Sequence, residues 1–319
     1  MTRIRIPVGL SGSLLDDPEQ DDGGNKHVAG ATKSAMPYLR FEPVSPEIAL
    51  GGSVFRSSPT QRRTRESPIR LRMRQGAMQH VTQYASALST EKIGQLRHLC
   101  GYILCATTSG DDRADVACGD SVPQKAPKKG MDLFIRALAQ HMPWLPIGEE
   151  RHLRRPEVWE HFIERVCALH ELNQLWQHDL SRGALIAFHS RYKLLLLAHS
   201  QPQYRELGPF VARIDRWASL EEYVIEYRAR LMTLLSTPPT RRNHTNVLMH
   251  VQGYFRRQLN TQQRQELAQH IDCYRRGLQP LSAPIALLRQ YMAQYPDAYL
   301  AQQRYFSPYL ETLRLCDGN

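Results

Sequence analysis

The first half of the chain alternates short hydrophobic runs with segments of helical spacing. Runs rich in β-branched and aromatic residues at Ile4–Leu10, Phe41–Val44 and Leu99–Ala106 have the length of buried strands. Apolar positions recur with a helical period at Ala77–Leu88 and Met131–His141. Strands that alternate with helices predict an α/β domain with a parallel sheet of the doubly wound type.

After Pro156 the apolar positions follow a helical period almost to the end of the chain, which predicts an all-α second domain. The signals for helix ends agree with that period. Ser181 is a preferred N-cap residue, Asn260 and Gln263 have the spacing of a capping box, and Gly277 is suited to a C-cap. The first helix of this domain carries the apolar residues Val158, Phe162, Val166, Leu169, Leu172 and Leu175.

Prolines mark the expected interruptions. Three of them, at 143, 146 and 156, lie where the two patterns meet, and we place a domain boundary there, which gives an α/β domain over 1–150 and an all-α domain over 151–319. Pro238-Pro239 is expected to separate two helices. Further helices are expected over about 181–200, 246–259, 284–294 and 297–306.

The net charge of +10 is concentrated in the second half of the chain. Residues 151–319 carry 22 Lys and Arg against 15 Asp and Glu, a net +7, while residues 1–150 carry 19 against 16, a net +3. A basic excess favours a polyanionic partner, because neutralising phosphates releases counterions. The charge alone is equally consistent with a basic protein that has no such partner.

Composition also excludes some classes of protein. No apolar run is long enough to span a bilayer, and the first ten residues do not have the pattern of a secretory signal. The six cysteines are scattered without the spacing of a disulfide framework. We therefore expect a cytoplasmic protein that does not contact a membrane.

The segment Arg56–Arg74 holds seven arginines and one acidic residue, Glu66. The Ser, Pro and Thr residues between them predict an exposed loop outside the core. The segment is either a solvated charge run or an arm that contacts phosphates, and its composition favours the first interpretation.

Three polar residues follow the three predicted strands, one after each. They are Ser13, Ser45 and Asp111, and the carboxyl ends of parallel strands meet at the edge where such sheets bind ligands. These positions could therefore converge in one crevice. The motifs around them are Ser11-Gly12-Ser13-Leu14-Leu15, Pro43-Val44-Ser45-Pro46-Glu47 and Gly101-Tyr102-Ile103-Leu104. They resemble motifs of the TudS-like desulfidases.

In the family that these motifs resemble, the three positions are cysteines that hold a 4Fe–4S cluster, whose open iron takes sulfur from a thiolated uracil. Thiolates are the preferred ligands of such clusters, whereas serine coordinates iron poorly and aspartate is a harder, weaker match. The surrounding motif has also drifted, since Thr108–Arg113 replaces the family's Ser-Pro-Ser-Cys-Gly-Met. We therefore expect neither a cluster nor another cofactor, and a site that has lost its sulfur chemistry.

Other parts of the family pattern persist. Asp22 belongs to a matching Asp-Gly-Gly turn and Glu47 to a matching Pro-Glu element, so the resemblance implies that both are equivalent to catalytic positions. Ser67–Leu71 and Lys129–Phe134 match two further segments. These residues either retain a part in chemistry or now serve only the fold, and the drift nearby favours the second interpretation.

The remaining cysteines and histidines do not indicate a replacement metal site. Cys100 and Cys105 are separated by an odd number of residues, so on one strand they face opposite sides. No pair of histidines at i and i+4 accompanies a nearby carboxylate. We expect buried structural thiols, no metal, and structural or RNA-contacting roles for His189, His199, His244 and His250.

Distinctive polar and aromatic segments run through the second half. They are Ala168–Leu172, Ser181–Leu185, His189–Lys193, Ala198–Ser200, Leu207–Ala212, Asn243–His250, Gly253–Phe255, Tyr274–Gly277 and Tyr295–Asp297. Together they resemble the YbgA family from about Phe162 to Leu315. A TudS-like half fused to such a domain is the arrangement of the RudS-type enzymes. That resemblance implies removal of sulfur from 4-thiouridine in transfer RNA, with the helical half helping to bind the RNA.

The residues of the helical half agree with RNA binding on their own terms. The basic residues after Ser181 are spaced by seven and four, so they share one helix face. Arginine pairs suit phosphates or form a solvated surface, and Tyr254 and Phe255 suit base stacking or core packing, which is favoured for Phe255. The predicted RNA-binding residues are Arg182, His189, Lys193, Arg241, Arg242, His244, Arg256, Arg257, Arg275 and Arg276.

The sequence therefore predicts a protein that binds transfer RNA and resembles 4-thiouridine desulfidases without sharing their activity. Two alternatives stay open. One is an active desulfidase with atypical cluster ligands, and the other is an interaction scaffold that binds no RNA.

Overall fold

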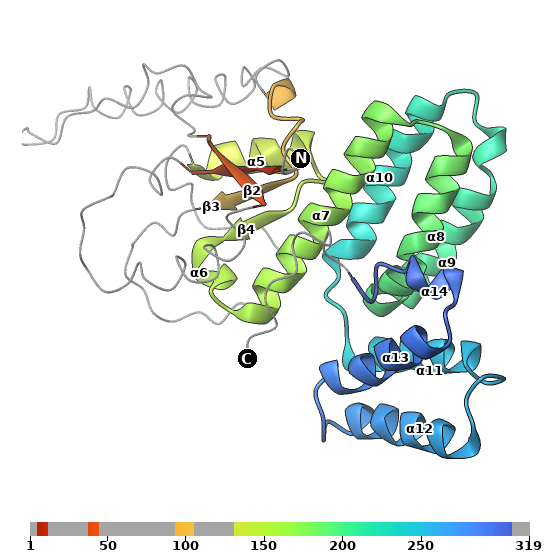
Figure 1. The fold of residues 1–319 in the computed structure, drawn as a ribbon. Coiled ribbons are helices and arrows are strands. Elements are labelled where there is room, and N and C mark those ends of the chain that lie inside the picture. Colours follow the sequence, from red (N-terminus) through yellow and green to blue (C-terminus); the bar gives the residue numbers. More distant parts are fainter. Residues whose placement is uncertain (1–4, 12–37, 45–92, 105–130, 308–319) are drawn as a thin grey trace, which may run out of the picture. The chain divides into compact units, whose positions relative to one another are not determined.

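The computed structural model describes residues 5–11, 38–44, 93–104 and 131–307 (Figure 1). The chain divides into two compact units, Met1–Trp159 and Glu160–Asn319, which we call the sheet unit and the helical unit. The predicted helix at Ala77–Leu88 and the arginine-rich segment Arg56–Arg74 lie outside the described residues.

The sheet unit contains a parallel four-stranded sheet. Its strands are β1 (Ile6–Leu10), β2 (Leu39–Pro43), β3 (Gly101–Leu104) and β4 (Ile147–Glu149), in the spatial order β2-β1-β3-β4. That order is found in doubly wound folds, where the first crossover reverses direction beside β1. The predicted α/β class is confirmed, although the pattern missed β4, because three residues are too few to show a strand period.

The core of the sheet unit lies against the inner strands. Ile6 and Val8 of β1 are fully buried, and Leu39 of β2 is nearly so, because each residue pairs in register with an apolar neighbour. The helix α5 (Met131–His141) has the bounds that its helical spacing predicted. Its Phe134 is fully buried and meets the ring of Tyr102 edge-on, at 5.7 Å between centroids.

The division between the two units falls inside one continuous helix. After the short α6 (Glu150–Leu153), α7 runs from Pro156 to His178, while the units divide between Trp159 and Glu160. Pro156 begins α7, because the first residue of a helix has no intrahelical use for the N–H that proline lacks. A proline that marked the expected linker therefore belongs to a helix.

The helical unit is built from short connections between helices, and its predicted all-α class is confirmed. Ser181 caps α8 through its side-chain oxygen, which accepts from Ala184 N, and Asn260 and Gln263 form the predicted capping box. Gly277 has a φ of 80°, the left-handed conformation that ends many helices. After α7 the elements are α8 (Arg182–His199), α9 (Gln201–Ala212), the 3-10 helix η2 (Ile214–Arg216), α10 (Leu220–Ser236), α11 (Arg241–Tyr254), α12 (Thr261–Arg275), α13 (Ser282–Gln294) and α14 (Ala298–Ala301).

Two predicted helices have different bounds in the structure. The helix expected over 246–259 is α11, which begins five residues earlier because Thr240 Oγ1 accepts from Asn243 N at 3.2 Å. The helix expected over 297–306 is the single turn α14, capped by Asp297. For α11 the capping residue sets the start more reliably than apolar spacing does, whereas for α14 the predicted start agrees with the cap and only the end is earlier.

The residue after α14 that matters most for packing is Gln303, which is 2% exposed. Its Oε1 accepts from Leu194 N at 3.2 Å, and its Nε2 donates to Ser190 O at 2.8 Å. Those two backbone groups are hydrogen-bond partners in a regular helix, so the glutamine amide takes the place of one backbone hydrogen bond of α8.

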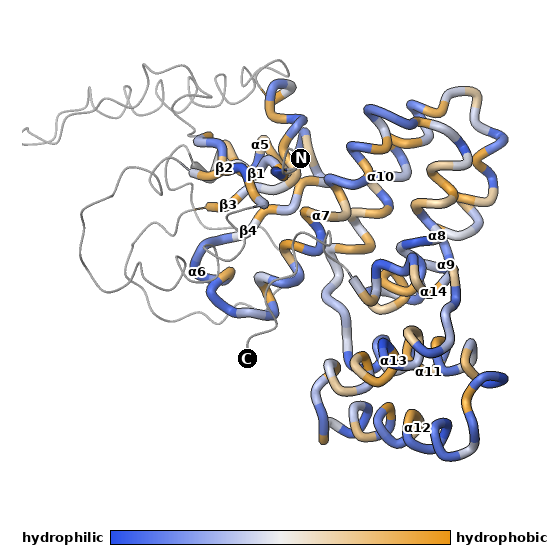
Figure 2. Tube along the Cα trace, in the orientation of Figure 1, coloured by the Kyte–Doolittle hydropathy of each residue, from blue (hydrophilic) through white to orange (hydrophobic). Residues whose placement is uncertain are grey.

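Figure 2 shows α12 as largely hydrophilic, and only a narrow stripe of it is buried, at Leu267, Ile271 and Tyr274.

Candidate functional site

The residues that the sequence assigned to sulfur chemistry lie outside the described residues. These are the cluster-equivalent positions Ser13, Ser45 and Asp111 and the catalytic-equivalent positions Asp22 and Glu47. Their assignments stay predictions. The structure describes the strand ends that precede three of them, at Ser11, Val44 and Leu104.

Backbone hydrogen bonds join these strand ends to one another. Ser11 N donates to Ile103 O at 3.1 Å, and Val44 N donates to Leu10 O at 2.9 Å. Because the three strands are parallel and adjacent, their carboxyl ends form one edge of the sheet, as the sequence predicted.

A tyrosine crosses this edge on one face of the sheet. Tyr102 of β3 extends its ring over Gly9 of β1, and its hydroxyl donates to Val44 O, beyond the end of β2, at 2.9 Å. A Cβ at Gly9 would lie 2.6 Å from the Tyr102 ring, so the crossing needs a glycine. Burial raises the pKa of the Tyr102 hydroxyl, which keeps it a donor. The Gly101-Tyr102-Ile103-Leu104 motif thus positions the residue next to Ser45.

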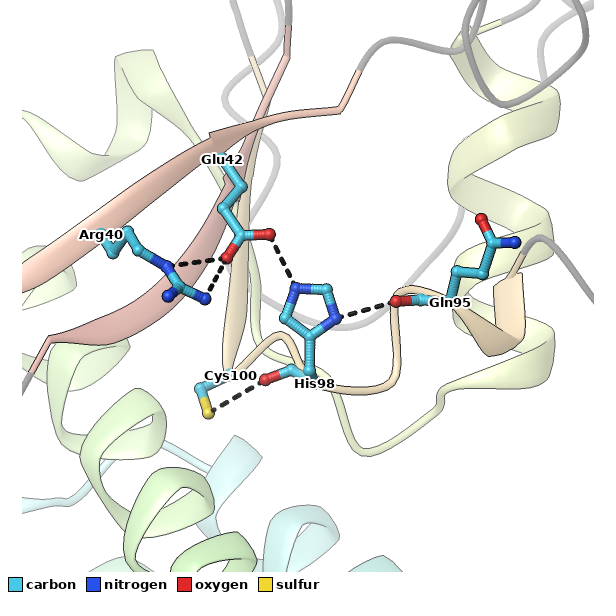
Figure 3. A network of polar contacts seen from close by, with 5 residues as sticks. All are labelled: Arg40, Glu42, Gln95, His98 and Cys100. Atoms are coloured by element: carbon cyan, nitrogen blue, oxygen red, sulfur yellow. Dashed lines mark hydrogen bonds and ion pairs between the residues drawn. The ribbon is translucent and has the colours of Figure 1, made fainter.

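An exposed polar network joins β2 to the turn before β3 (Figure 3). Glu42 accepts from Arg40 at 2.6 Å and from His98 Nε2 at 2.7 Å, while His98 Nδ1 lies 2.8 Å from Gln95 O. Both imidazole nitrogens face acceptors, so both bonds form together only when the ring is protonated. Burial alone would raise the pKa of the Glu42 carboxyl, but hydrogen bonds from His98 and Arg40 outweigh it and hold that pKa below its usual range.

The one cysteine of the sheet unit that the structure describes is far from a ligand position. Cys100 is 1% exposed and directly precedes β3, so it lies at the amino end of that strand while the predicted site lies at the carboxyl end. Its Sγ is 3.8 Å from His98 O. Cys105, Cys118 and Cys316 lie outside the described residues.

In the helical unit, the basic residues predicted on one face of α8 have different surroundings. Arg182 is exposed and forms an ion pair with Asp215 at 3.4 Å. Lys193 is half-buried, and His189 is only 8% exposed. The three residues therefore lie on one face of α8, but that face is exposed at Arg182, half-buried at Lys193 and buried at His189.

His189 is a buried neutral residue in this structure. Its Nδ1 lies 3.2 Å from the Tyr227 hydroxyl, and its ring is parallel to that of Tyr204 with centroids 5.8 Å apart. Burial, followed by the charge of Lys193, lowers the pKa of His189 to about 4. His189 therefore packs inside the helical unit, and it carries no positive charge that could bind a ligand at neutral pH.

The other predicted histidine, His244, also faces inward. Its Nδ1 lies 3.0 Å from the Tyr305 hydroxyl, and burial lowers its pKa to about 4. Nearby, His199 Nδ1 binds Thr237 O at 2.7 Å and its Nε2 lies 3.4 Å from Glu164. Structural roles were one of the two expectations for these histidines, and these contacts agree with it.

The structure brings two of the three predicted arginine pairs together. Arg241 begins α11, and its guanidinium carbon lies 5.7 Å from the centre of the Tyr274 ring near the end of α12. It also lies against Gly277, which immediately follows Arg275 and Arg276. We call Arg241, Arg242, Arg275 and Arg276 the arginine cluster.

The arginine cluster has one acidic neighbour, Asp272. Arg275 binds its Oδ1 at 2.6 Å, and Arg276 lies 3.7 Å from its Oδ2. The hydrogen bond from Arg275 is the main cause that lowers the pKa of the Asp272 carboxyl. Among the described residues, Arg242 has no acidic partner. Four guanidiniums and one carboxylate leave a net +3 on an exposed surface.

The third pair is separate from this cluster. Arg256 and Arg257 follow the last residue of α11, whereas Arg241 and Arg242 begin it, so a helix of 14 residues, about 20 Å, lies between them. Within the described ranges, neither Arg256 nor Arg257 has an acidic partner. Next to them, Phe255 is fully buried, as the sequence favoured, and Tyr254 is 42% exposed.

A largely buried carboxylate, which was not predicted from the sequence, joins three parts of the helical unit. Glu171 of α7 accepts from Arg191 and Tyr192 of α8 and from Arg304 beyond α14, each at 2.9 Å. Burial alone would raise the pKa of Glu171, but the two arginines outweigh it and hold that pKa low. The sequence did contain a signal for this carboxylate, because Glu164 and Glu171 are seven residues apart and so lie on the same side of α7 as its apolar residues.

Comparisons with known proteins match the helical part of the chain. A family described as "Protein of unknown function (DUF1722)" matches residues 193–309. The chain is 57% identical over 151 residues to a protein of Escherichia coli (strain K12) called "Uncharacterized protein YbgA", which covers 47% of this chain and 89% of that protein. No solved structure matches the chain.

The range of the family match lies entirely in the helical unit. The resemblance of residues 1–150 to TudS-like desulfidases therefore stays a prediction. Of the helices that the structure describes, none is both long and apolar enough to cross a membrane.

Proposed function

This chain belongs to the YbgA family, and from that premise we propose that it binds transfer RNA through its helical unit and has lost the sulfur chemistry of the desulfidases that its first half resembles. The observation that carries the RNA proposal is the arginine cluster. Two pairs more than thirty residues apart in sequence form one surface with a net +3.

The chemistry of this surface suits phosphates. Guanidiniums bind phosphate oxygens in a bidentate manner and remain charged at any physiological pH. Arg241 is held by the ring of Tyr274, and Arg275 by Asp272, so part of the side-chain entropy that binding would cost is already lost. The net +7 of residues 151–319 adds long-range attraction for a polyanion.

Transfer RNA in particular is supported by the resemblance of the two halves to fused 4-thiouridine desulfidases. The contacts of the arginine cluster themselves select for phosphate and carry no base sequence. Recognition of one nucleic acid over another must therefore come from shape or from contacts elsewhere on the helical unit.

The loss of sulfur chemistry rests on the donor set. Two serines and an aspartate at 13, 45 and 111 do not fit an iron–sulfur cluster, which requires soft thiolates. Cys100 does not substitute for them, since it is buried at the amino end of β3. No step of a reaction is therefore assigned to a cluster in this protein.

The RNA proposal is tested by measuring the affinity for transfer RNA as a function of salt. We expect binding that weakens steeply with salt, and the double variant Arg242→Glu/Arg276→Glu should bind much more weakly. The salt slope should also fall by about 2, because two phosphate contacts are removed.

A matched control is available in Arg97→Glu/Arg136→Glu, since both arginines are exposed, the total charge changes equally, and both lie in the sheet unit. If both double variants lose affinity to the same extent, the arginine cluster is not the binding site. If the unaltered protein binds no transfer RNA, or binds it with a flat salt response, the scaffold hypothesis replaces this proposal.

The loss of the cluster is tested by anaerobic reconstitution with iron and sulfide. We expect no stoichiometric iron or acid-labile sulfide on the protein after desalting. A control in which Ser13, Ser45 and Asp111 are all changed to Cys should gain iron if the frame of the site survives. Stoichiometric incorporation by the unaltered protein would instead support desulfidase activity with atypical ligands.

A further inference from the structure

An exposed aromatic side chain of the helical unit lies close in sequence to two arginines that have no acidic partner among the described residues. Tyr254, the last residue of α11, is 42% exposed, and its ring is stacked on Tyr299 of α14 with centroids 5.4 Å apart and an angle of 15° between the planes. Burial, and after it the Tyr254 hydroxyl, raise the pKa of the Tyr204 hydroxyl of α9. The direct support of the exposed ring is the Tyr299 ring.

Other aromatic contacts of the helical unit continue into its core. Tyr204 lies parallel to the buried His189, and His189 contacts Tyr227, which is 1% exposed. Tyr254 itself is packed on Tyr299. A ring packed in this way loses little conformational freedom when a second flat group packs on its open face.

Part of the Tyr254 ring is open to solvent. Tyr254 is 42% exposed even though it packs on Tyr299, and Gly253, which precedes it, is itself exposed. Arg256 and Arg257 follow within one turn and, in the part of the chain that the structure describes, have no acidic partner. An open ring face and two free guanidiniums therefore lie within four residues.

Another aromatic ring in the same unit, Phe210, is already covered by the protein's own side chains. An open pocket of about 400 Å³ is lined by Phe210 and Trp217, but the Arg230 guanidinium lies 4.7 Å from the centre of the Phe210 ring. Tyr223 stacks on Phe210 at 4.9 Å, and Glu226 holds Arg230 at 2.7 Å. This comparison favours Tyr254 as the ring that can accept a ligand.

We propose that Tyr254, supported by Tyr299, stacks an unpaired base of the bound RNA while Arg256 and Arg257 contact the neighbouring phosphates. This inference rests on the proposed function and adds to it the recognition of single-stranded RNA. Stacking on an aromatic ring needs an unpaired base, because the faces of paired bases are covered by their neighbours in a helix. The arginine cluster, by contrast, needs only phosphates.

The test compares a short single-stranded RNA with a blunt duplex that contains the same strand. Tyr254→Ala should weaken binding of the single strand by about 5- to 150-fold, the range that removal of a stacking ring causes, and should leave duplex binding unchanged. Tyr254→Phe should bind like the unaltered protein, because it keeps the ring. Tyr254→Leu, which keeps apolar volume without an aromatic face, should behave like Tyr254→Ala.

The matched control is Met249→Ala, since Met249 is 59% exposed on the same helix and has no aromatic ring. Photocrosslinking of a 5-iodouridine-containing single strand gives a readout independent of affinity, and the crosslink should map to the peptide that contains Tyr254. Equal losses for single strand and duplex in Tyr254→Ala, or no loss in either, would overturn the stacking site. Absence of any RNA binding by the unaltered protein would instead overturn the proposed function.

Discussion

The sheet unit and the helical unit hold their distant segments together by different means. In the sheet unit, the strand ends are joined by backbone bonds and by one neutral hydroxyl that crosses Gly9 to reach Val44. In the helical unit, the segments are joined by charges inside the fold, and Glu171 and Arg304 are 133 residues apart. The arrangement of the strand ends therefore requires that Gly9 has no side chain, whereas the packing of the helical unit requires the paired charges around Glu171.

This difference predicts where each unit is vulnerable. Steric changes should damage the sheet edge, whereas loss of a charge or a change of protonation should damage the helical unit. The arginine cluster should be sensitive to both kinds of change. Its function depends on exposed charges, and Arg241 occupies space that is free only because Gly277 has no side chain.

The largest effect is expected for Glu171→Ala. Removing the carboxylate leaves Arg191 and Arg304, both largely buried, without their shared partner, which should cost about 3–5 kcal/mol of unfolding free energy. Thermal unfolding followed by circular dichroism would measure the loss. Glu226→Ala removes a carboxylate from an exposed pair and should cost less than about 1 kcal/mol; similar losses for the two variants would contradict the comparison.

The next effect is a loss of stability of the helical unit in acid. The pKa of His189 is about 4 in the folded protein, below the ordinary value of 6.5, so between these pH values the unfolded chain binds more protons. Stability should therefore fall as the pH falls from 7 to 5, by about 2 kcal/mol for this residue. Denaturant unfolding of the unaltered protein and of His189→Gln would measure it, and the variant should show a flatter pH dependence. An equal dependence in both proteins would show that His189 is not the source.

A smaller loss is expected for Gly9→Ala in the sheet unit. The added Cβ would meet the Tyr102 ring at 2.6 Å and should cost about 1–3 kcal/mol through overpacking. Amide hydrogen exchange should show the change at β1 and β3 and leave the helical unit protected. In the double variant Gly9→Ala/Tyr102→Leu, the exchange at β1 should move back toward that of the unaltered protein, and no such recovery would mean that the ring crossing is not the constraint.

The smallest loss of stability is expected for Gly277→Ala. This glycine has a φ of 80°, so an alanine there should cost about 1 kcal/mol, and its Cβ would also displace the Arg241 guanidinium. Affinity for transfer RNA should fall even at a temperature where the variant is fully folded. Arg241→Gln in the same background should then add little, and a large additional loss would show that Arg241 keeps its place without the glycine.

The sequence predicted those parts of the fold that depend on neighbours in the chain. The parallel α/β class, the bounds of α5 and the caps at Ser181 and Asn260 follow from local spacing and local hydrogen bonds. It did not predict β4, whose three residues carry no period and whose place is set by pairing with β3. The true start of α11 was missed for another reason, since its local cap at Thr240 was passed over in favour of apolar spacing. Local signals are short in range, and they fail where a contact from far along the chain decides the outcome.

For the candidate sites, residue types came from the sequence and their arrangement came from tertiary structure. The basic character of the second half and the presence of Ser13, Ser45 and Asp111, none of them a cysteine, are properties of the sequence alone. Only the fold decided that two arginine pairs meet while the third lies a helix away, and that the buried His189 and the half-buried His244 both have a pKa lowered to about 4. Charge and ligand chemistry belong to single residues, whereas desolvation and proximity arise when distant segments pack, so only the folded chain could decide which of the predicted residues can meet a ligand.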